Sequence, residues 1–167
     1  RNIELTLEID GEPVATEFGE LDFFDKGVIG GAIVLRISRE AVDALIDGKP
    51  VAILLDLKPA LSHQQLSDRI DRELAELEPE AWVRDVLRKL MSAKVLLPVS
   101  KKARIKLSDN ITGMTGDNKK EIIDVLKAYR LEVTDYRPFE EAIVTAGGID
   151  VSQVDPATLQ SKLVRGL

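Results

Sequence analysis

The chain has 167 residues, of which 29 are acidic and 23 basic, so it carries a net charge of −6 at neutral pH. This excess of negative charge disfavours phosphate backbones and anionic lipids, and we expect neither nucleic acid nor a membrane as a partner. The chain contains no cysteine and one histidine, which excludes disulfides and thiolate ligands, predicts no metal site and fits a cytoplasmic protein. Because 44% of the residues are hydrophobic, the chain can bury the core of one domain or of two small lobes.

The first section alternates apolar and polar residues, as a β-strand with one buried face does. The alternating apolar residues are Ile3, Leu5, Leu7 and Ile9. A turn at Asp10-Gly11 and a second extended run to Phe23 predict a β-meander, and residues 51–57 are an apolar run of strand length. Residues 27–38 are ambiguous, because their β-branched residues favour a strand while their apolar spacing also fits a helix.

Residues 62–129 change to helical spacing and predict a small helical lobe. Ser62 and Gln65 have the spacing of a capping box at the start of its first helix. Pro79 suits the first turn of a second helix, and a last helix is expected to begin near Asp117 or Asn118.

The third section returns to a strand pattern, first around Leu131 and Val133 and again over residues 142–145. Because the helical lobe offers no sheet edge, we expect these strands to pair with the N-terminal sheet and to close it into a barrel. The sequence therefore predicts an α+β fold. Residues 1–61 and 130–167 would form a β-barrel-like module, and residues 62–129 an inserted helical lobe.

The candidates for catalysis or metal binding are weak. His63 follows directly after a helix N-cap, where side chains are usually solvated, so a surface histidine is favoured over a general base. The carboxylates of residues 68–80 are interleaved with arginines and lack the spacing of a calcium loop, which favours a solvated face. Residues 113–119 lack the ending of a phosphate loop, and Trp82 is expected in the core rather than on a ligand. We predict no catalytic residue and no metal ligand.

Two adjacent glycines, Gly147 and Gly148, follow the apolar run at residues 142–145. They permit positive φ and a close approach of another backbone or of a ligand, and a plain turn is an equally good interpretation. The sequence ends at Leu167 without the cap or polar run that usually closes a soluble domain. Such an ending is typical of a segment excised from a larger protein.

Two stretches carry a resemblance to a known family. Residues 139–167 are similar to F-x-x-A-x-V-T-A-G-G-V followed by D-P-x-T-x-x-S-K-L-V-P-G-L, and residues 19–38 are similar to G-E-[LM]-L-F-T-H-x-G-[LI]-S-G-P-A-x-L-x-[LI]-S. These are motifs of the BaiN-like flavoproteins, FAD-dependent oxidoreductases also described as aminoacetone-oxidase-like or NAD(FAD)-utilizing dehydrogenases. Arg165 replaces a proline of the motif, and Phe24 and Asp25 replace its Thr-His pair, so no polar role is carried over to that pair.

The resemblance implies that this chain is the insert domain of an FAD-dependent oxidoreductase, and that the FAD-binding Rossmann domain is absent from this chain. The insert would cover the flavin domain of the same polypeptide and help to form a pocket for a small-molecule substrate. FAD would be the cofactor of the full-length protein, with none expected in this chain alone, which we expect to be colourless and inactive. Thr145, Ala146, Gly147 and Gly148 are implied at the interface with the flavin domain. The resemblance also favours a helix for residues 30–38.

A second interpretation belongs to a different class of function. In it the chain is a non-catalytic protein-interaction or regulatory module, whose helical lobe recruits another protein or a second subunit. Flanking sequence separates the two interpretations, because an upstream G-x-G-x-x-G with an acidic residue about 20 positions on would support the flavoenzyme.

Overall fold

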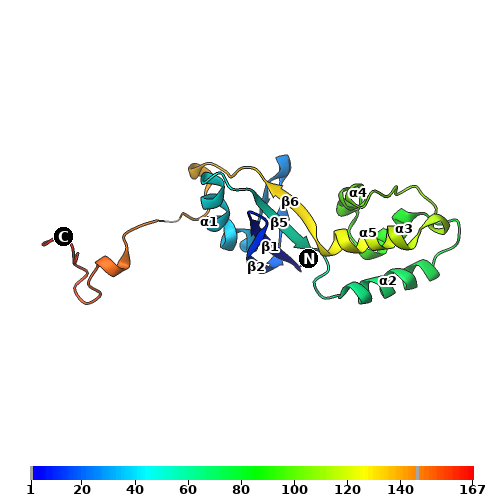
Figure 1. The fold of residues 1–167 in the computed structure, drawn as a ribbon, viewed down its shortest axis with the longest axis horizontal. Coiled ribbons are helices and arrows are strands. Elements are labelled where there is room, and N and C mark those ends of the chain that lie inside the picture. The colour runs from blue at the N-terminus through cyan, green and yellow to red at the C-terminus, as the bar shows by residue number, and fades with distance from the viewer. Residues whose placement is uncertain (1, 146) are drawn as a thin grey trace. The chain divides into compact units, whose positions relative to one another are not determined.

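The computed structural model describes residues 2–145 and 147–167, which fall into two compact units, Arg1–Asp135 and Tyr136–Leu167. In the first unit, a sheet with one helix continues into a helical lobe (Figure 1). The strands are β1 (Asn2–Ile9), β2 (Glu12–Glu20), β3 (Asp22–Phe23), β4 (Ile29–Gly30), β5 (Val51–Asp56) and β6 (Tyr129–Val133). The α-helices are α1 (Ala32–Ile46), α2 (His63–Ala75), α3 (Val83–Leu90), α4 (Ala93–Lys102) and α5 (Gly116–Lys127). Short 3₁₀ helices span Asp25–Gly27, Ile111–Gly113, Phe139–Glu141 and Val151–Gln153.

The main sheet has four antiparallel strands in the order β2-β1-β5-β6. Strands β1 and β2 are joined by the turn at Asp10-Gly11, whose φ values of 55° and 82° suit a tight two-residue hairpin. Leu5 and Leu7 are fully buried, and they lie opposite buried residues of β5 on the same face of the sheet. The alternation in the sequence therefore marks the buried face of β1, as predicted.

Helix α1 covers the apolar face of this sheet. The side chains that α1 buries lie along one side of the helix and pack against the buried side chains of β1 and β5. They are Ile33, Ile37, Ala41 and Ala44. Gly31 precedes the helix with a φ of 109°, and a Cβ there would lie 2.8 Å from the backbone oxygen of Glu20. The helix expected for residues 30–38 is confirmed from Ala32 onward, because burial of this apolar stripe outweighs the β-propensity of its Val and Ile residues.

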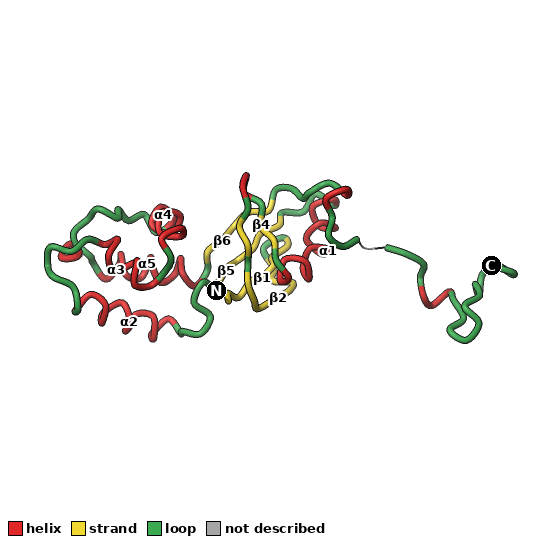
Figure 2. The backbone as a smooth tube through the Cα atoms, turned by 180° about the vertical axis from the view of Figure 1, so that it is seen from behind, coloured by secondary structure: helices red, strands yellow, loops and turns green. Residues whose placement is uncertain are grey.

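Helices α2 to α5 lie between β5 and β6 in the chain and form a separate group beside the sheet (Figure 2). They have a hydrophobic core of their own. Its fully buried side chains include Leu66, Ile70, Val86, Leu87, Leu90, Val99, Ile122 and Leu126. Ser62 Oγ accepts the backbone N–H of Gln65 at 3.2 Å, and Gln65 Oε1 accepts the N–H of Ser62 at 2.9 Å. The predicted capping box at the start of α2 is therefore confirmed.

Lys127 joins the helical lobe to the sheet. It is the last residue of α5, and its Nζ lies 2.5 Å from Oδ2 of Asp56, the last residue of β5. The same ammonium donates to the carbonyl oxygens of Lys58 at 3.2 Å and Leu61 at 2.7 Å. Because only 13% and 14% of the two paired side chains are exposed, this cluster of bonds is largely shielded from water.

The α+β class is confirmed, but the sheet is open and not closed into a barrel. Strands β2 and β6 are the two edges of the described sheet, and residues 142–145 contain bends at Ile143 and Val144 instead of the expected closing strand. Among the described residues beyond β6, strand-like pairing is limited to an isolated bridge between Val154 and Ser161, so no ladder is available to pair with β2.

Candidate functional site

The residues implied at a flavin interface belong to the second compact unit. Thr145, Gly147 and Gly148 are exposed, and Ala146 lies outside the described residues. Gly147 and Gly148 have φ values of 126° and 125°, which side chains of L-residues rarely adopt, and a Cβ at either position would meet no atom within 4 Å. The backbone conformation therefore requires these glycines, and the space beside them is open.

The remainder of the second unit consists of turns held by local hydrogen bonds. Asp150 Oδ1 accepts the backbone N–H of Ser152 at 2.9 Å. Hydrogen bonds from the Ser152 side chain and backbone lower the pKa of Asp150, because they stabilise its charged form. The backbone N–H of Lys162 donates to the carbonyl of Gln153 at 2.8 Å, and its ammonium donates to the carbonyl of Ser152 at 2.9 Å. These bonds define the local path of the chain after Gly148.

The second unit has no hydrophobic core among its described residues, since none of residues 136–145 and 147–167 is buried. Its exposed large apolar side chains are Tyr136, Phe139, Ile143, Val144, Ile149, Val151, Leu159, Leu163, Val164 and Leu167. Val151 is 84% exposed and Ile143 79%. A segment of this length cannot stabilise its turns by burial within itself, and so much apolar surface is typical of a contact with another protein surface.

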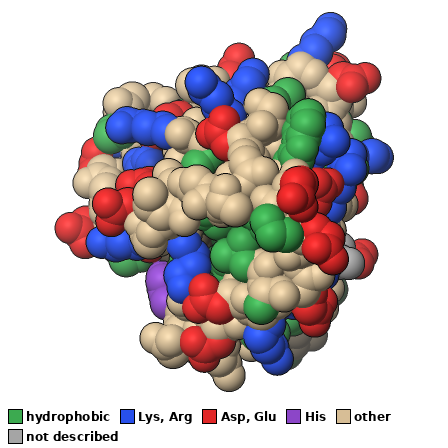
Figure 3. Space-filling model, turned by 90° about the vertical axis from the view of Figure 1, so that its right-hand side faces the viewer, with side chains coloured by type: hydrophobic (Ala, Val, Ile, Leu, Met, Phe, Trp, Pro, Cys, Tyr) green, Lys and Arg blue, Asp and Glu red, His purple; other side chains and the backbone are tan. Residues whose placement is uncertain are grey.

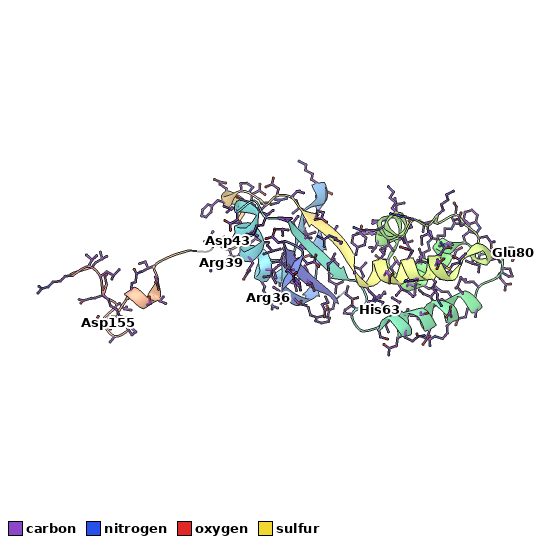
Figure 4. All side chains as sticks on the ribbon, in the orientation of Figure 1. Arg36, Arg39, Asp43, His63, Glu80 and Asp155 are labelled. Carbon is purple, nitrogen blue, oxygen red and sulfur yellow. The ribbon has the colours of Figure 1, made fainter. Side chains whose placement is uncertain are left out.

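The other sites considered from the sequence have structural roles. His63 is exposed at the first position of α2, as expected for a surface histidine (Figure 4). Residues 113–119 run from the end of a 3₁₀ helix into the first turn of α5, which begins at Gly116 and is capped by Thr115. Within residues 2–145 and 147–167, no group of three His, Asp or Glu side chains is arranged to hold a metal ion. In the same ranges, no helix is long and apolar enough to cross a bilayer.

The prediction that Trp82 packs into the core is wrong. Helix α3 begins at Val83 instead of near Pro79, so Trp82 is the N-cap residue and lies outside the buried stripe of the helix. The Trp82 side chain is 41% exposed, and the guanidinium of Arg84 lies 4.1 Å from the centroid of its ring. The ring therefore stacks with a cation at the surface of the lobe.

Sequence reasoning gave weight to the glycines and no role to the apolar residues that follow them. In the structure these apolar side chains are exposed and make up the apolar surface of the second unit. A signal was available, because the apolar residues after Gly148 sustain neither the period of a strand nor that of a helix. Apolar residues without either period cannot form one buried face of a regular element.

The open antiparallel sheet and the helical lobe inserted between β5 and β6 define an α+β domain. The chain belongs to the family described as the HI0933-like protein barrel and H2TH domain, a flavoprotein family whose model matches residues 1–144. It is similar to the 3-dehydro-bile acid delta(4,6)-reductase of Clostridium scindens, with 25% identity over 154 residues. That match covers 92% of this chain and 37% of the relative, so the chain spans little more than a third of the relative's length. The resemblance to the BaiN-like flavoproteins is thereby confirmed.

Proposed function

We propose that this chain is the insert domain of an FAD-dependent oxidoreductase. It covers the FAD-binding domain of the same polypeptide and helps to form the pocket for a small-molecule substrate. The observation that carries this proposal is the second unit, where hydrogen-bonded turns present apolar side chains and no described residue is buried. The match to the family model ends at residue 144, and the residues implied at the interface begin with the next residue, Thr145.

Thr145, Ala146, Gly147 and Gly148 contribute backbone to this interface. The open space beside Gly147 and Gly148 would admit the backbone of a neighbouring domain or an edge of the flavin. FAD, bound by the full-length protein, supplies the hydride chemistry, and the chain supplies position and shape. None of the four residues has an acidic or basic side chain, so their role is positioning. A cytoplasmic setting, suggested by the lack of cysteine, is part of the same proposal.

The proposed interface is tested by Gly147→Val in the intact protein, with Gly48→Val as a matched control. Gly48 also has positive φ, at 71°, and a Cβ added there would likewise meet no atom within 4 Å, but it lies before β5 and away from the second unit in sequence. Valine is strained at both positions: the cost is about 1–2 kcal/mol in the left-handed region near Gly48, and it is larger at the φ of 126° of Gly147, so the thermal midpoint of each variant is measured beside its flavin content. We expect only Gly147→Val to lower flavin content and turnover. Equal flavin content and turnover in the two variants would remove the interface role.

Limited proteolysis tests whether the flavin domain covers the second unit in the intact protein. In the isolated chain, trypsin is expected to cut quickly after Lys162 and Arg165, because both lie among exposed residues. In the intact flavoprotein the same bonds should be protected by the flavin domain. Equal cleavage rates in the two forms would contradict the proposal. The isolated chain should also be colourless, and flavin absorbance in it would place the FAD site within these residues.

A further inference from the structure

The helical lobe carries a basic surface that the proposed flavin interface does not use. Residues 86–108 contain seven Lys and Arg and no Asp or Glu, in a chain whose net charge is −6. The seven residues are Arg88, Lys89, Lys94, Lys101, Lys102, Arg104 and Lys106. Figure 3 looks onto this end of the first unit and shows Lys and Arg side chains over the upper part of the face, with Asp and Glu side chains between them. A stretch of chain with cations and no carboxylates favours binding of an anionic partner where those cations are unpaired.

Four of these cations have no partner within the described part of the chain. The other three have partners. Arg88 lies 3.7 Å from Asp85, and Lys89 lies 2.9 Å from Glu76. The ammonium of Lys102 lies 4.8 Å from the ring centroid of Tyr129. The side chains of Lys94, Lys101, Arg104 and Lys106 are exposed and make no ion pair or hydrogen bond with any described residue. Their charge is therefore available to a ligand.

Arg104 has a backbone conformation that favours glycine. Its φ is 55°, and it follows Ala103, the C-cap residue of α4. The N–H of Ile105 donates to the carbonyl of Ser100 at 3.0 Å and closes the end of the helix in the way that usually places glycine at the position of Arg104. An arginine is strained there, and strain of this kind is concentrated at functional positions.

The strained arginine lines a hollow. Arg104 and Lys106 border a cavity of about 120 Å³, together with Asp109 and with residues at the starts of α3 and α5. Trp82 and Arg84 flank this region, since the N–H of Arg84 donates to the carbonyl of Leu107 at 3.1 Å and Trp82 forms a bridge with Asn110. An exposed tryptophan and arginines around a hollow have the composition of an interaction hot spot.

We propose that the surface formed by Trp82, Arg84, Arg104 and Lys106 binds an acidic segment of a partner protein. Asp109 favours a peptide over a nucleic acid, because its carboxylate lines the same hollow and has no donor among the described residues. A peptide brings N–H donors for Asp109 as well as carboxylates for Arg104 and Lys106. A phosphodiester backbone brings acceptors only. The net negative charge of the chain also opposes a long polyanion.

Trp82 is the single tryptophan of the chain and serves as a built-in fluorescence reporter. The 167-residue chain is titrated with an acetylated peptide of alternating Glu and Gly, and with a matched Gln-Gly peptide. We expect saturable binding of the Glu peptide that weakens as salt is added, because exposed charges are screened, and no binding of the Gln peptide. Failure of the Glu peptide to bind at millimolar concentration would overturn the proposal. So would equally tight binding of the Gln peptide, of an oligothymidine or of inorganic phosphate.

Arg104→Gly separates binding from stability, because it removes the guanidinium and the backbone strain together. We expect an unchanged or higher melting temperature and an affinity for the Glu peptide lowered about three- to tenfold. Lys26→Gly is the matched control, since Lys26 is an exposed cation with a φ of 60° in the loop between β3 and β4. Its affinity should equal that of the parent chain. An Arg104→Gly variant that binds as the parent does, or a Lys26→Gly variant that loses as much, would show the proposal to be wrong.

Discussion

Replacing Lys127 with methionine tests how the helical lobe is held to the sheet. Methionine keeps the apolar length of the side chain and removes the ammonium. The carboxylate of Asp56 and the carbonyls of Lys58 and Leu61 then lose the donor that they share. Because these groups connect the end of α5 to the end of β5, we expect the loss to destabilise the first unit as a whole.

The size of the effect follows from the burial of the pair. Removing one member of a fully buried ion pair costs about 3–5 kcal/mol. Asp56 is 14% exposed and keeps a hydrogen bond from the N–H of Lys58 at 2.8 Å, which offsets part of this cost. We therefore expect Lys127→Met to lower the free energy of unfolding by about 2–4 kcal/mol. Lys119→Met, on the same helix, breaks a pair with Asp71 whose side chains are 24% and 58% exposed, and it should cost less than about 1 kcal/mol.

The assay is urea denaturation followed by far-UV circular dichroism on both variants. Adding Asp56→Asn to Lys127→Met should recover about 1–2 kcal/mol, because the uncharged amide still accepts from Lys58 and no unpaired charge remains. If Lys127→Met and Lys119→Met lower the free energy of unfolding by amounts within about 0.5 kcal/mol of each other, the argument from burial is refuted.

Three further substitutions test the packing of the first unit. Gly31→Ala should cost about 2 kcal/mol or more, because it combines a φ of 109° with a Cβ at 2.8 Å from the oxygen of Glu20, and an unchanged thermal midpoint would contradict this. Leu87→Ala should cost about 2–5 kcal/mol, since Leu87 is fully buried in the lobe. Trp82→Ala should cost less than about 1.5 kcal/mol, because the ring is 41% exposed and its main contact is the cation of Arg84. Equal shifts of the urea midpoint for Leu87→Ala and Trp82→Ala would place the ring in the core after all.

Features that depend on near neighbours in the chain were readable from the sequence. The hairpin at Asp10-Gly11 and the capping box of Ser62 and Gln65 each satisfy their geometry within a few residues. The alternation of β1 and the apolar stripe of α2 likewise report a buried face through local spacing. The helix at α1 needed family resemblance, because its β-branched residues obscure the periodic signal.

Features that depend on distant residues were not readable. Closure of the sheet requires a ladder between β2 and a later strand, and the apolar run at residues 142–145 forms no ladder with any described strand. The exposure of Trp82 depends on the residue at which α3 begins. Apolar spacing alone does not define that residue to within a few positions. The hollow beside Arg104 depended on three helix ends meeting.

The fold class and the helical lobe follow from periodicity and capping residues, and the flavoprotein family from the resemblance of two sequence motifs, all of which are read along the chain. Three features appear only in the folded chain: the sheet is open, no described residue after Gly148 is buried, and Arg104 and Asp109 line one hollow. The physical reason is that exposure and proximity are sums over contacts from all parts of the molecule. A local pattern states which residues prefer burial, and the packing of the whole unit decides which of them obtain it.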